Sequence, residues 1–370
     1  MRLPCLPLAY VGQIDGVVGT LVLDNLWELG RPVKPARRLW LSAVQFLFGV
    51  LVVAGAGLVA WRLWPQPDLP QGWLTIRPPV DTMALLEVGD TIWSGGRDGV
   101  AVLDRDGGVL LEWIEADVPL QYVTSLATDG VTTWVGHDLG LSGTSGGEWH
   151  TLTVADGLPD NHILALCYSP ASGLWVGTGR GLANFRQGPW AVYGQAQGLA
   201  SDVVSVILED SRGRLWAGNG RDTVGGLSML AEERWQVFTT SNGLAHNVVN
   251  AILEMPDGGL WFGTGFSSRG GASHFDGRTW LTLTQEDGLA GAKVRSLFLD
   301  AASVLWFGSE YDGLARYDGR SWQIYTPENG LAGWEVKAML QDSRGNLWLG
   351  TENGLTRISR QAWETLSTQP

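Results

Sequence analysis

The stretch that decides the fold is DSRGNLWLGTENGL, residues 342–355. It opens with a turn of Asp, Ser, Gly and Asn, continues through a short apolar run around Trp348, and reaches a second turn at Gly354. Such turns separate the short strands of an antiparallel sheet. In a related run, Leu260 to Phe262, consecutive residues are apolar, so both faces of the strand must be covered. The motif therefore predicts a small sheet packed between neighbouring sheets.

This motif is one copy of an internal repeat. Seven tryptophans recur in similar settings at spacings of 41 to 45 residues: Trp93, Trp134, Trp175, Trp216, Trp261, Trp306 and Trp348. A second series falls between them: Trp73, Trp113, Trp149, Trp190, Trp235, Trp280, Trp322 and Trp363. A third marker, containing Gly-Leu, recurs at residues 156–163, 197–204, 242–249, 287–294 and 329–336. Repeats of roughly 42 residues are typical of four-stranded propeller blades.

The repeats predict an all-β chain that forms a single seven-bladed β-propeller of four-stranded antiparallel blades over residues 72–370. In the fourth repeat we expect strands over residues 203–209, 215–218, 227–230 and 235–239. The second tryptophan series has one member too many for seven blades. We expect residues 363–366 to close the last blade locally, because a short connection costs little loop entropy, and residues 73–77 to act as a tether.

A hydrophobic segment precedes the propeller. Residues 39–61 read LWLSAVQFLFGVLVVAGAGLVAW, 23 residues without a charge, and predict one transmembrane helix. Four basic residues lie on its N-terminal side against Arg62 on the other, which indicates that residues 1–38 form a short cytoplasmic segment. Residues 62–71 form a Pro-rich linker. The alternative is a cleaved secretory signal, and in either case we expect the propeller to be exported.

The charge distribution disfavours several classes of partner. The net charge is −13: residues 1–71 hold 6 basic and 4 acidic side chains, and the remainder hold 19 and 34. An acidic body repels phosphate backbones, so nucleic acid is not an expected partner. The two cysteines, Cys5 and Cys167, lie far apart in the sequence, which argues against a disulfide framework or a cysteine-rich zinc site. We expect no cofactor and no metal.

The repeat resembles the two-component regulator propeller family, whose pattern is D-x-x-G-x-L-W-[IVL]-G-T followed by G-L. Asp342, Gly345, Leu347 to Thr351, Gly354 and Leu355 match this pattern, and the resemblance extends over about residues 82–360. It implies the extracytoplasmic sensing part of a bacterial hybrid sensor kinase, whose propeller binds a ligand, often a carbohydrate fragment. We find no histidine-kinase or receiver pattern here, so we expect a non-enzymatic sensor in the bacterial plasma membrane that acts through a partner membrane protein, with its propeller periplasmic or extracellular.

The candidate ligand-binding surface is the face that carries the loops between blades and the loops between second and third strands, because function concentrates on loops. Its candidate residues from the first kind of loop are Asn161, His162, Asp202, His246, Asn247, Trp334 and Glu335. Those from the second kind are Arg97, Arg180, Arg221, Arg269 and Tyr311, together with His137. Trp334 stands out, because it is the one tryptophan after Trp73 that belongs to neither periodic series.

Two other functions remain open. An exported propeller enzyme such as a lyase needs a base and an acid near the ring axis, and the candidate set is His162, His246, Lys293 and Glu335. The chain could also be a structural subunit of a membrane complex. We favour recognition of a glycan or protein ligand, because the sequence carries no catalytic motif.

Overall fold

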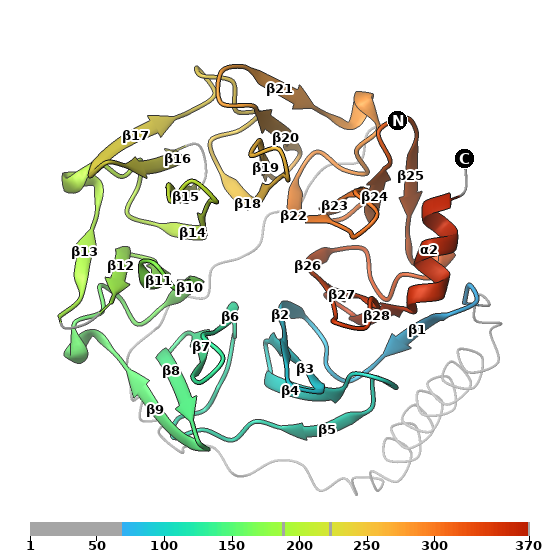
Figure 1. Cartoon of the computed structure of the whole chain (residues 1–370), viewed down its shortest axis with the longest axis horizontal. Helices are drawn as coiled ribbons and strands as arrows, with labels where there is room; N and C mark the ends of the chain where they lie inside the picture. Colours follow the sequence, from blue (N-terminus) through green and yellow to red (C-terminus); the bar gives the residue numbers. More distant parts are fainter. Residues whose placement is uncertain (1–68, 187–188, 222–223, 369–370) are drawn as a thin grey trace, which may run out of the picture. The chain divides into compact units, whose positions relative to one another are not determined.

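The computed structural model describes residues 69–368, apart from 187–188 and 222–223. The described residues form seven four-stranded antiparallel sheets arranged as blades around a ring (Figure 1). The seven-bladed propeller predicted from the repeats is therefore confirmed. In each blade we call the strands A to D, from the innermost to the outermost.

The first four blades each consist of four consecutive strands. Blades 1 and 2 contain β2 (Thr82–Val88), β3 (Thr91–Gly96), β4 (Gly99–Asp104), β5 (Leu110–Trp113), β6 (Ser125–Thr128), β7 (Thr133–His137), β8 (Gly140–Ser145) and β9 (Glu148–Leu152). Blades 3 and 4 contain β10 (Ile163–Ser169), β11 (Gly173–Thr178), β12 (Gly181–Phe185), β13 (Ala191–Tyr193), β14 (Val204–Glu209), β15 (Leu215–Arg221), β16 (Val224–Ala231) and β17 (Arg234–Phe238).

Blades 5 and 6 also consist of four consecutive strands, whereas blade 7 takes its outermost strand from the start of the propeller. Blades 5 and 6 contain β18 (Val249–Glu254), β19 (Leu260–Phe266), β20 (Arg269–Phe275), β21 (Trp280–Leu283), β22 (Val294–Leu299), β23 (Leu305–Ser309), β24 (Leu314–Tyr317) and β25 (Trp322–Tyr325). Blade 7 contains β26 (Val336–Gln341), β27 (Leu347–Thr351), β28 (Gly354–Ile358) and β1 (Trp73–Ile76), and is followed by α2 (Arg360–Thr368). Single 3-10 turns follow four D strands: η1 (Val154–Asp156), η2 (Gln195–Gln197), η3 (Gln285–Asp287) and η4 (Pro327–Asn329).

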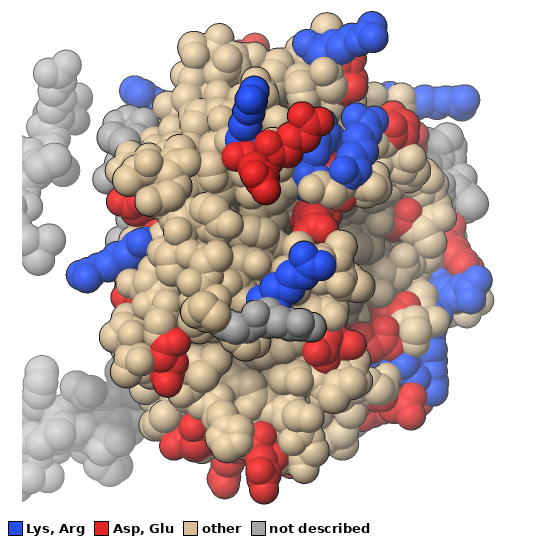
Figure 2. Space-filling model, turned by 60° about the vertical axis from the view of Figure 1, so that its left-hand side comes forward, with Lys and Arg blue, Asp and Glu red and all other residues tan. Residues whose placement is uncertain are grey.

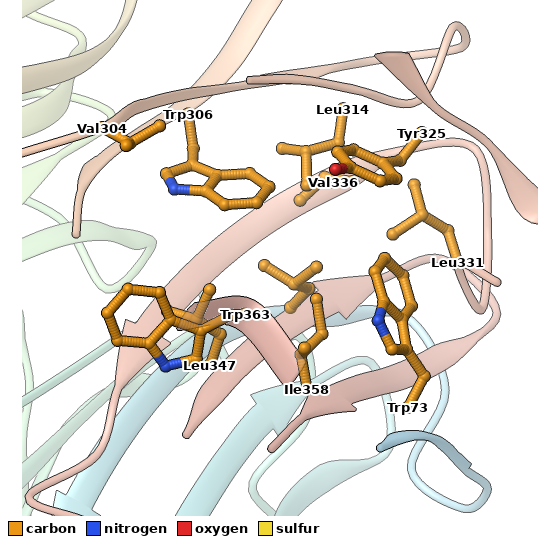
Figure 3. Packing of buried hydrophobic residues seen from close by; sticks show 11 residues of the cluster. Trp73, Val304, Trp306, Leu314, Tyr325, Leu331, Val336, Leu347, Ile358 and Trp363 are labelled. Atoms are coloured by element: carbon orange, nitrogen blue, oxygen red, sulfur yellow. The ribbon is translucent and has the colours of Figure 1, made fainter. Parts of the chain in front are cut away.

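The ring closes differently from the sequence-based expectation. The outer strand of blade 7 is β1, in which Trp73 pairs with Ile358 and Ile76 pairs with Leu355, so the expected local closure by residues 363–366 is wrong (Figure 1). Those residues lie in α2, where Trp363 is buried in the same apolar cluster as Trp73 (Figure 3). Pairing the first strand with the last blade joins the two ends of the propeller.

The two longer repeats have longer hairpins between strands B and C. In the fourth repeat these strands were expected over residues 215–218 and 227–230, but their pairing continues to Arg221 with Val224. In the fifth repeat the pairing continues to Phe266 with Arg269. The extra residues lengthen the hairpins, because their backbone groups can pair with each other across the turn.

A hydrogen bond from tryptophan to aspartate links each well-matched A–B turn to its blade. In blade 7, Asp342 Oδ2 accepts a hydrogen bond of 2.9 Å from Trp348 Nε1, while Oδ1 accepts from the backbone of Arg344 and Asn346. Blades 4 and 6 repeat the indole bond with Asp210–Trp216 at 2.8 Å and Asp300–Trp306 at 2.9 Å. Trp216, Trp306 and Trp348 are fully buried between blades.

Polar side chains near the ends of A strands tie neighbouring blades together. Glu254 of blade 5 accepts hydrogen bonds from the backbone and hydroxyl of Ser211 in blade 4. Glu87 of blade 1 makes the same two bonds with Ser343 of blade 7, at 2.8 and 2.7 Å. This contact crosses the junction where the ring closes, so it adds to the strand pairing there.

The recurring Gly-Leu marker fills the space between blades. After each connecting turn a leucine is buried: Leu158, Leu199, Leu244, Leu289 and Leu331. The preceding glycine has a positive φ, 125° at Gly243, and a Cβ atom there would lie 2.5 Å from the Trp280 side chain. Glycine is therefore needed by both the backbone conformation and the close approach of the next blade.

The segment expected to span a membrane, residues 39–61, lies outside the described residues. Among the residues that the structure does describe, no helix has the length and apolar character to cross a bilayer.

Arg316 is an unusual buried cation. Its side chain lies opposite Trp306 across the β23–β24 pair, and it is 1% exposed. Nη1 lies 3.6 Å from Asp318, whereas Nε and Nη2 have no hydrogen-bond partner among the described residues. In blade 4 the position opposite Trp216 is held by Met229.

We expect Arg316→Met to raise the free energy of unfolding by about 1–3 kcal/mol, because it removes unpaired buried N–H groups and keeps the packing against Trp306. Urea unfolding of the two proteins measures the difference. The matched control is Arg214→Met, which should destabilise, because Arg214 bonds Asp210 at 2.6 Å. A loss of stability in Arg316→Met equal to that in the control would contradict the prediction.

His137 is buried, contrary to its expected place among the exposed loop residues. Its Nδ1 accepts from the Leu139 backbone at 3.3 Å, so Nε2 carries the proton and donates to Ser142 Oγ at 2.8 Å. The hydroxyl chain continues through Thr151 to Asp117. Burial lowers the pKa of His137 from 6.5 to about 4, despite the opposing charges of Asp138 and Asp117.

Stability should therefore depend on pH through His137. Because its pKa is lower in the folded protein, the neutral form contributes fully above pH 6.5, and the contribution falls by about 3 kcal/mol as the pH drops to about 4. His137→Asn copies Asn219, which accepts from Ser228 in blade 4, and should remove this part of the pH dependence. Urea unfolding at pH 7 and pH 4.5 tests it, and identical pH dependence in both proteins would refute it.

Candidate functional site

The candidate surface is the face on which the B–C hairpins and the ends of the connections between blades meet; we call it the B–C face. The Gly179 N–H donates to the carbonyl of His162 at 3.2 Å, and the Gly313 N–H donates to that of Trp334 at 2.9 Å. Each bond joins a hairpin to a connection. The two kinds of loop therefore share one face, as expected from the sequence.

A pocket of about 360 Å³ opens on this face between blades 6 and 7. It is lined by Glu310, Tyr311, Trp334, Glu335 and Glu352. Tyr311 is 68% exposed and Trp334 is 42% exposed, so both aromatic residues keep a substantial exposed surface. Three candidate residues from two loops, Tyr311 from a B–C hairpin and Trp334 and Glu335 from a connection between blades, are thus brought together.

Glu352 lines this pocket and holds the backbone beside it. Its two carboxylate oxygens accept hydrogen bonds from the backbone N–H groups of Trp334, at 2.8 Å, and Glu335, at 2.9 Å. The carboxylate lies so close to Gly333 that a Cβ atom there would be 2.3 Å from it. The glycine therefore permits the contact that fixes the backbone carrying Trp334.

A chain of ion pairs runs from the pocket across the join between blades 7 and 1. Glu335 contacts Arg295 at 3.2 Å and Lys337 at 3.0 Å, and Lys337 in turn contacts Asp81, which pairs with Arg97 at 2.8 Å. Burial alone would raise the pKa of Asp81, but its bonds to Lys337 and Arg97 hold that pKa below its ordinary value. The chain orders one sector of the B–C face.

Three other candidates hold their own loops. Asn161, Asp202 and Asn247 each accept a hydrogen bond of 2.8 to 2.9 Å from a backbone N–H seven residues earlier, that of Val154, Gln195 or Thr240. The three residues hold the same position of the Gly-Leu marker in their repeats. We assign them a role in positioning the connections between blades.

The two histidines of the candidate set lie apart from the pocket. His162 Nε2 lies 3.6 Å from Asp138. His246 Nδ1 accepts from the backbone of Val248 at 3.0 Å, and burial together with the charge of Arg269 lowers its pKa. Both effects favour the neutral form of His246.

The candidate arginines have differing environments. Arg97 belongs to the chain of ion pairs, whereas the Arg180 side chain is 80% exposed and lies 4.0 Å from Asp160. Arg269 is exposed at the start of β20. Arg221 ends β15, and its side chain lies outside the described part of the chain.

Sequence reasoning missed four residues of this sector: Glu310, Glu352, Arg295 and Lys337. Glu310 and Glu352 lie in B–C hairpins, and Glu310 adjoins Tyr311. Arg295 and Lys337 are the second residues of their A strands, where the register shifts by one residue. A charged residue inside an otherwise apolar strand was the available signal.

Over the described residues, no group of three or more His, Cys, Asp or Glu side chains could hold a metal ion.

The surface around the propeller carries both signs of charge. Figure 2 shows basic side chains scattered over the side that it presents, and acidic side chains gathered along its lower edge. This agrees with the acidic balance of the sequence after residue 71.

Structural comparison gives the same fold in several proteins. The extracellular domain described as that of a hybrid two component system from B. thetaiotaomicron matches with 20% identity and a TM-score of 0.66, covering 79% of this chain and 42% of that one. PorZ, a surface component of the type-IX secretion system of Porphyromonas gingivalis, matches with 14% identity and a TM-score of 0.60, covering 77% and 47%. This chain thus spans less than half of either.

A propeller enzyme has a similar structure as well. Virginiamycin B lyase from Staphylococcus aureus matches with 14% identity and a TM-score of 0.60, covering 78% of this chain and 98% of that one. At such identities the likeness shows the fold alone.

Sequence comparison is more specific. No curated protein sequence matches the chain. The family model described as the two component regulator propeller matches residues 198–221 and 332–353, which include the A–B turns and Trp216 and Trp348. In each matched repeat the tryptophan indole donates a hydrogen bond to the aspartate of the A–B turn: Trp216 to Asp210, and Trp348 to Asp342. Two stretches of the chain, residues 198–221 and 332–353, therefore match two-component regulator propeller repeats.

Proposed function

We propose that the chain is a membrane-anchored, extracytoplasmic recognition module that binds a glycan or protein ligand on its B–C face and acts through a partner membrane protein. The observation that carries this proposal is the pocket between blades 6 and 7. Trp334 and Tyr311 are large aromatic side chains that the packing of the blades does not require, and they remain exposed beside fixed carboxylates. Exposed aromatic anchors beside polar groups are typical of binding sites.

The first strand of the propeller enters blade 7 on the side opposite the B–C face. Trp73, the first residue of β1, pairs with Ile358 at the end of β28 that is remote from the hairpin at Gly354. The described chain therefore enters the ring away from the candidate surface.

The enzyme alternative has less support. Its candidate acid and base residues are engaged separately: His162 with Asp138, and Lys293 with Glu310. His246 accepts from a backbone N–H, and Glu335 is held by two cations. No pair among these four is in contact in the described structure, so the geometry favours recognition.

Mutation of the pocket tests the binding face. We expect Trp334→Ala and Tyr311→Ala each to weaken binding by about 1–3 kcal/mol with little change in melting temperature, because exposed rings contribute contact area rather than core packing. Glycan and peptide arrays probed with the full chain supply the ligand and measure the loss. Val131→Ala, on the opposite face at a residue 76% exposed, is the control for binding.

The control for stability is Trp306→Ala, which should cost about 3–5 kcal/mol through the cavity left between blades. If Trp334→Ala binds normally but melts far below the parent, then Trp334 is a packing residue and the B–C face is not the recognition surface.

The exported location has its own test. In a chain with Cys5→Ser and Cys167→Ser, we expect Val131→Cys to react with a membrane-impermeant maleimide on intact spheroplasts, because residue 131 is exposed and the propeller lies outside. A chain that keeps only Cys5 should react after lysis alone. Labelling of residue 131 only after lysis would place the propeller in the cytoplasm and overturn the proposed location.

A further inference from the structure

The pocket that holds Trp334 and Tyr311 continues into a second hollow. A cavity of about 300 Å³ adjoins it, lined in part by Lys293 and Asp312, and the two share Glu310 and Tyr311. Tyr311, which is 68% exposed, therefore stands between two compartments on the B–C face.

The second compartment already holds a cation that belongs to the chain. The Lys293 ammonium lies 2.6 Å from Glu310 Oε1 and 5.9 Å from the centre of the Phe266 ring. A carboxylate and an aromatic face together stabilise an ammonium group through its charge and through the ring quadrupole. The Lys293 side chain is only 11% exposed, so this arrangement holds the cation while most of its water has been removed.

The first compartment has the same chemistry without a cation. Its five lining residues are two aromatic side chains and three glutamates, with no basic residue among them. Arg295 and Lys337 contact Glu335 but are not part of the lining. The compartment therefore presents carboxylate oxygens and aromatic faces to whatever occupies it.

The position of the carboxylates is fixed before any ligand arrives. Glu352 is held by two backbone N–H groups, and Glu310 and Glu335 are held by ion pairs. Because Glu310 and Glu335 are already paired with cations, Glu352 is the lining carboxylate that no cation contacts among the described residues. An anionic ligand would be repelled by Glu352, and a neutral ligand would displace its water without offsetting its charge, whereas a ligand cation would offset that charge.

We propose that the Tyr311–Trp334 pocket binds the alkylammonium group of the ligand, in the way that Phe266 and Glu310 hold Lys293. This inference rests on the proposed function and adds the chemical class of the group that is recognised. A lysine side chain and an amino sugar both present such a group, and the experiment distinguishes these two sources.

The test uses the full chain in detergent micelles, labelled with 5-fluorotryptophan and observed by ¹⁹F NMR. The resonance of Trp334 is assigned as the one that is missing from the spectrum of Trp334→Phe. The lysine probe is Nα-acetyl-lysine N-methylamide, and its neutral counterpart is acetylated on Nε as well. The sugar probe is glucosamine, and its neutral counterpart is N-acetylglucosamine. Each is titrated to millimolar concentration, and the shift of the Trp334 signal gives the affinity.

We expect at least one ammonium probe to shift the Trp334 signal with an affinity about tenfold or more above that of its neutral counterpart. Glu310→Gln should reduce this preference. Asp138→Asn, which removes one carboxylate from the same face at a distant blade, should leave it unchanged, and so separates the pocket from the general acidity of the domain.

Two results would overturn the proposal. Equal binding of charged and neutral probes would show that the pocket does not select a cation, although the B–C face would still bind ligands. No shift with any probe, together with an array ligand that depends on Trp334, would also refute the ammonium site and leave the proposed function standing. If the ammonium probes bind but no array ligand depends on Trp334, the ammonium site is supported, and the proposal that the B–C face is the recognition surface fails.

Discussion

The hydrogen bond between a buried aspartate and the indole of the B-strand tryptophan couples the A–B turn to the packing between blades in blades 4, 6 and 7. In blade 7 one carboxylate, that of Asp342, joins the A–B turn to Trp348, and Trp348 fills the space between blades. Neither the turn nor the packing is independent of the other. A buried carboxylate is costly unless its oxygens are satisfied, so the motif fixes the turn and the tryptophan together.

Ring closure depends on covering the apolar side chains at the outer part of blade 7. Trp73 from the start of the propeller and Trp363 from its end are buried in one cluster with Ile358, so blade 7 is incomplete without both ends of the chain (Figure 3). The Ser359 N–H also donates to the Gly72 carbonyl at 2.8 Å. Any pull on the segment before Trp73 acts on the outermost strand of this blade.

The asymmetry of the B–C face arises at one position of the A strand. The second residue is Ser205 in blade 4 and Asn250 in blade 5, and each bonds a backbone carbonyl of the next blade. In blades 6 and 7 the same position is Arg295 and Lys337, which reach carboxylates of the next blade instead. A small change at a repeated position thus turns a neutral link into a charged sector, and the pocket lies beside that sector.

The sequence by itself determined the seven blades, the position of their B strands and the exceptional status of Trp334, because local turn chemistry and a fixed period are written in neighbouring residues. It could not determine which strand closes the ring, since Trp73 and Trp363 have the same local pattern and differ only in their distant contacts. It also missed Glu352, Arg295 and Lys337, which become part of one site only when blades 6, 7 and 1 are side by side. Only the tertiary structure showed that Asn161 and Asn247 hold their own loops, because the path of each connection decides which backbone N–H group its side chain meets. It also showed that Tyr311 and Trp334 stay partly exposed, because burial depends on residues far away in the chain.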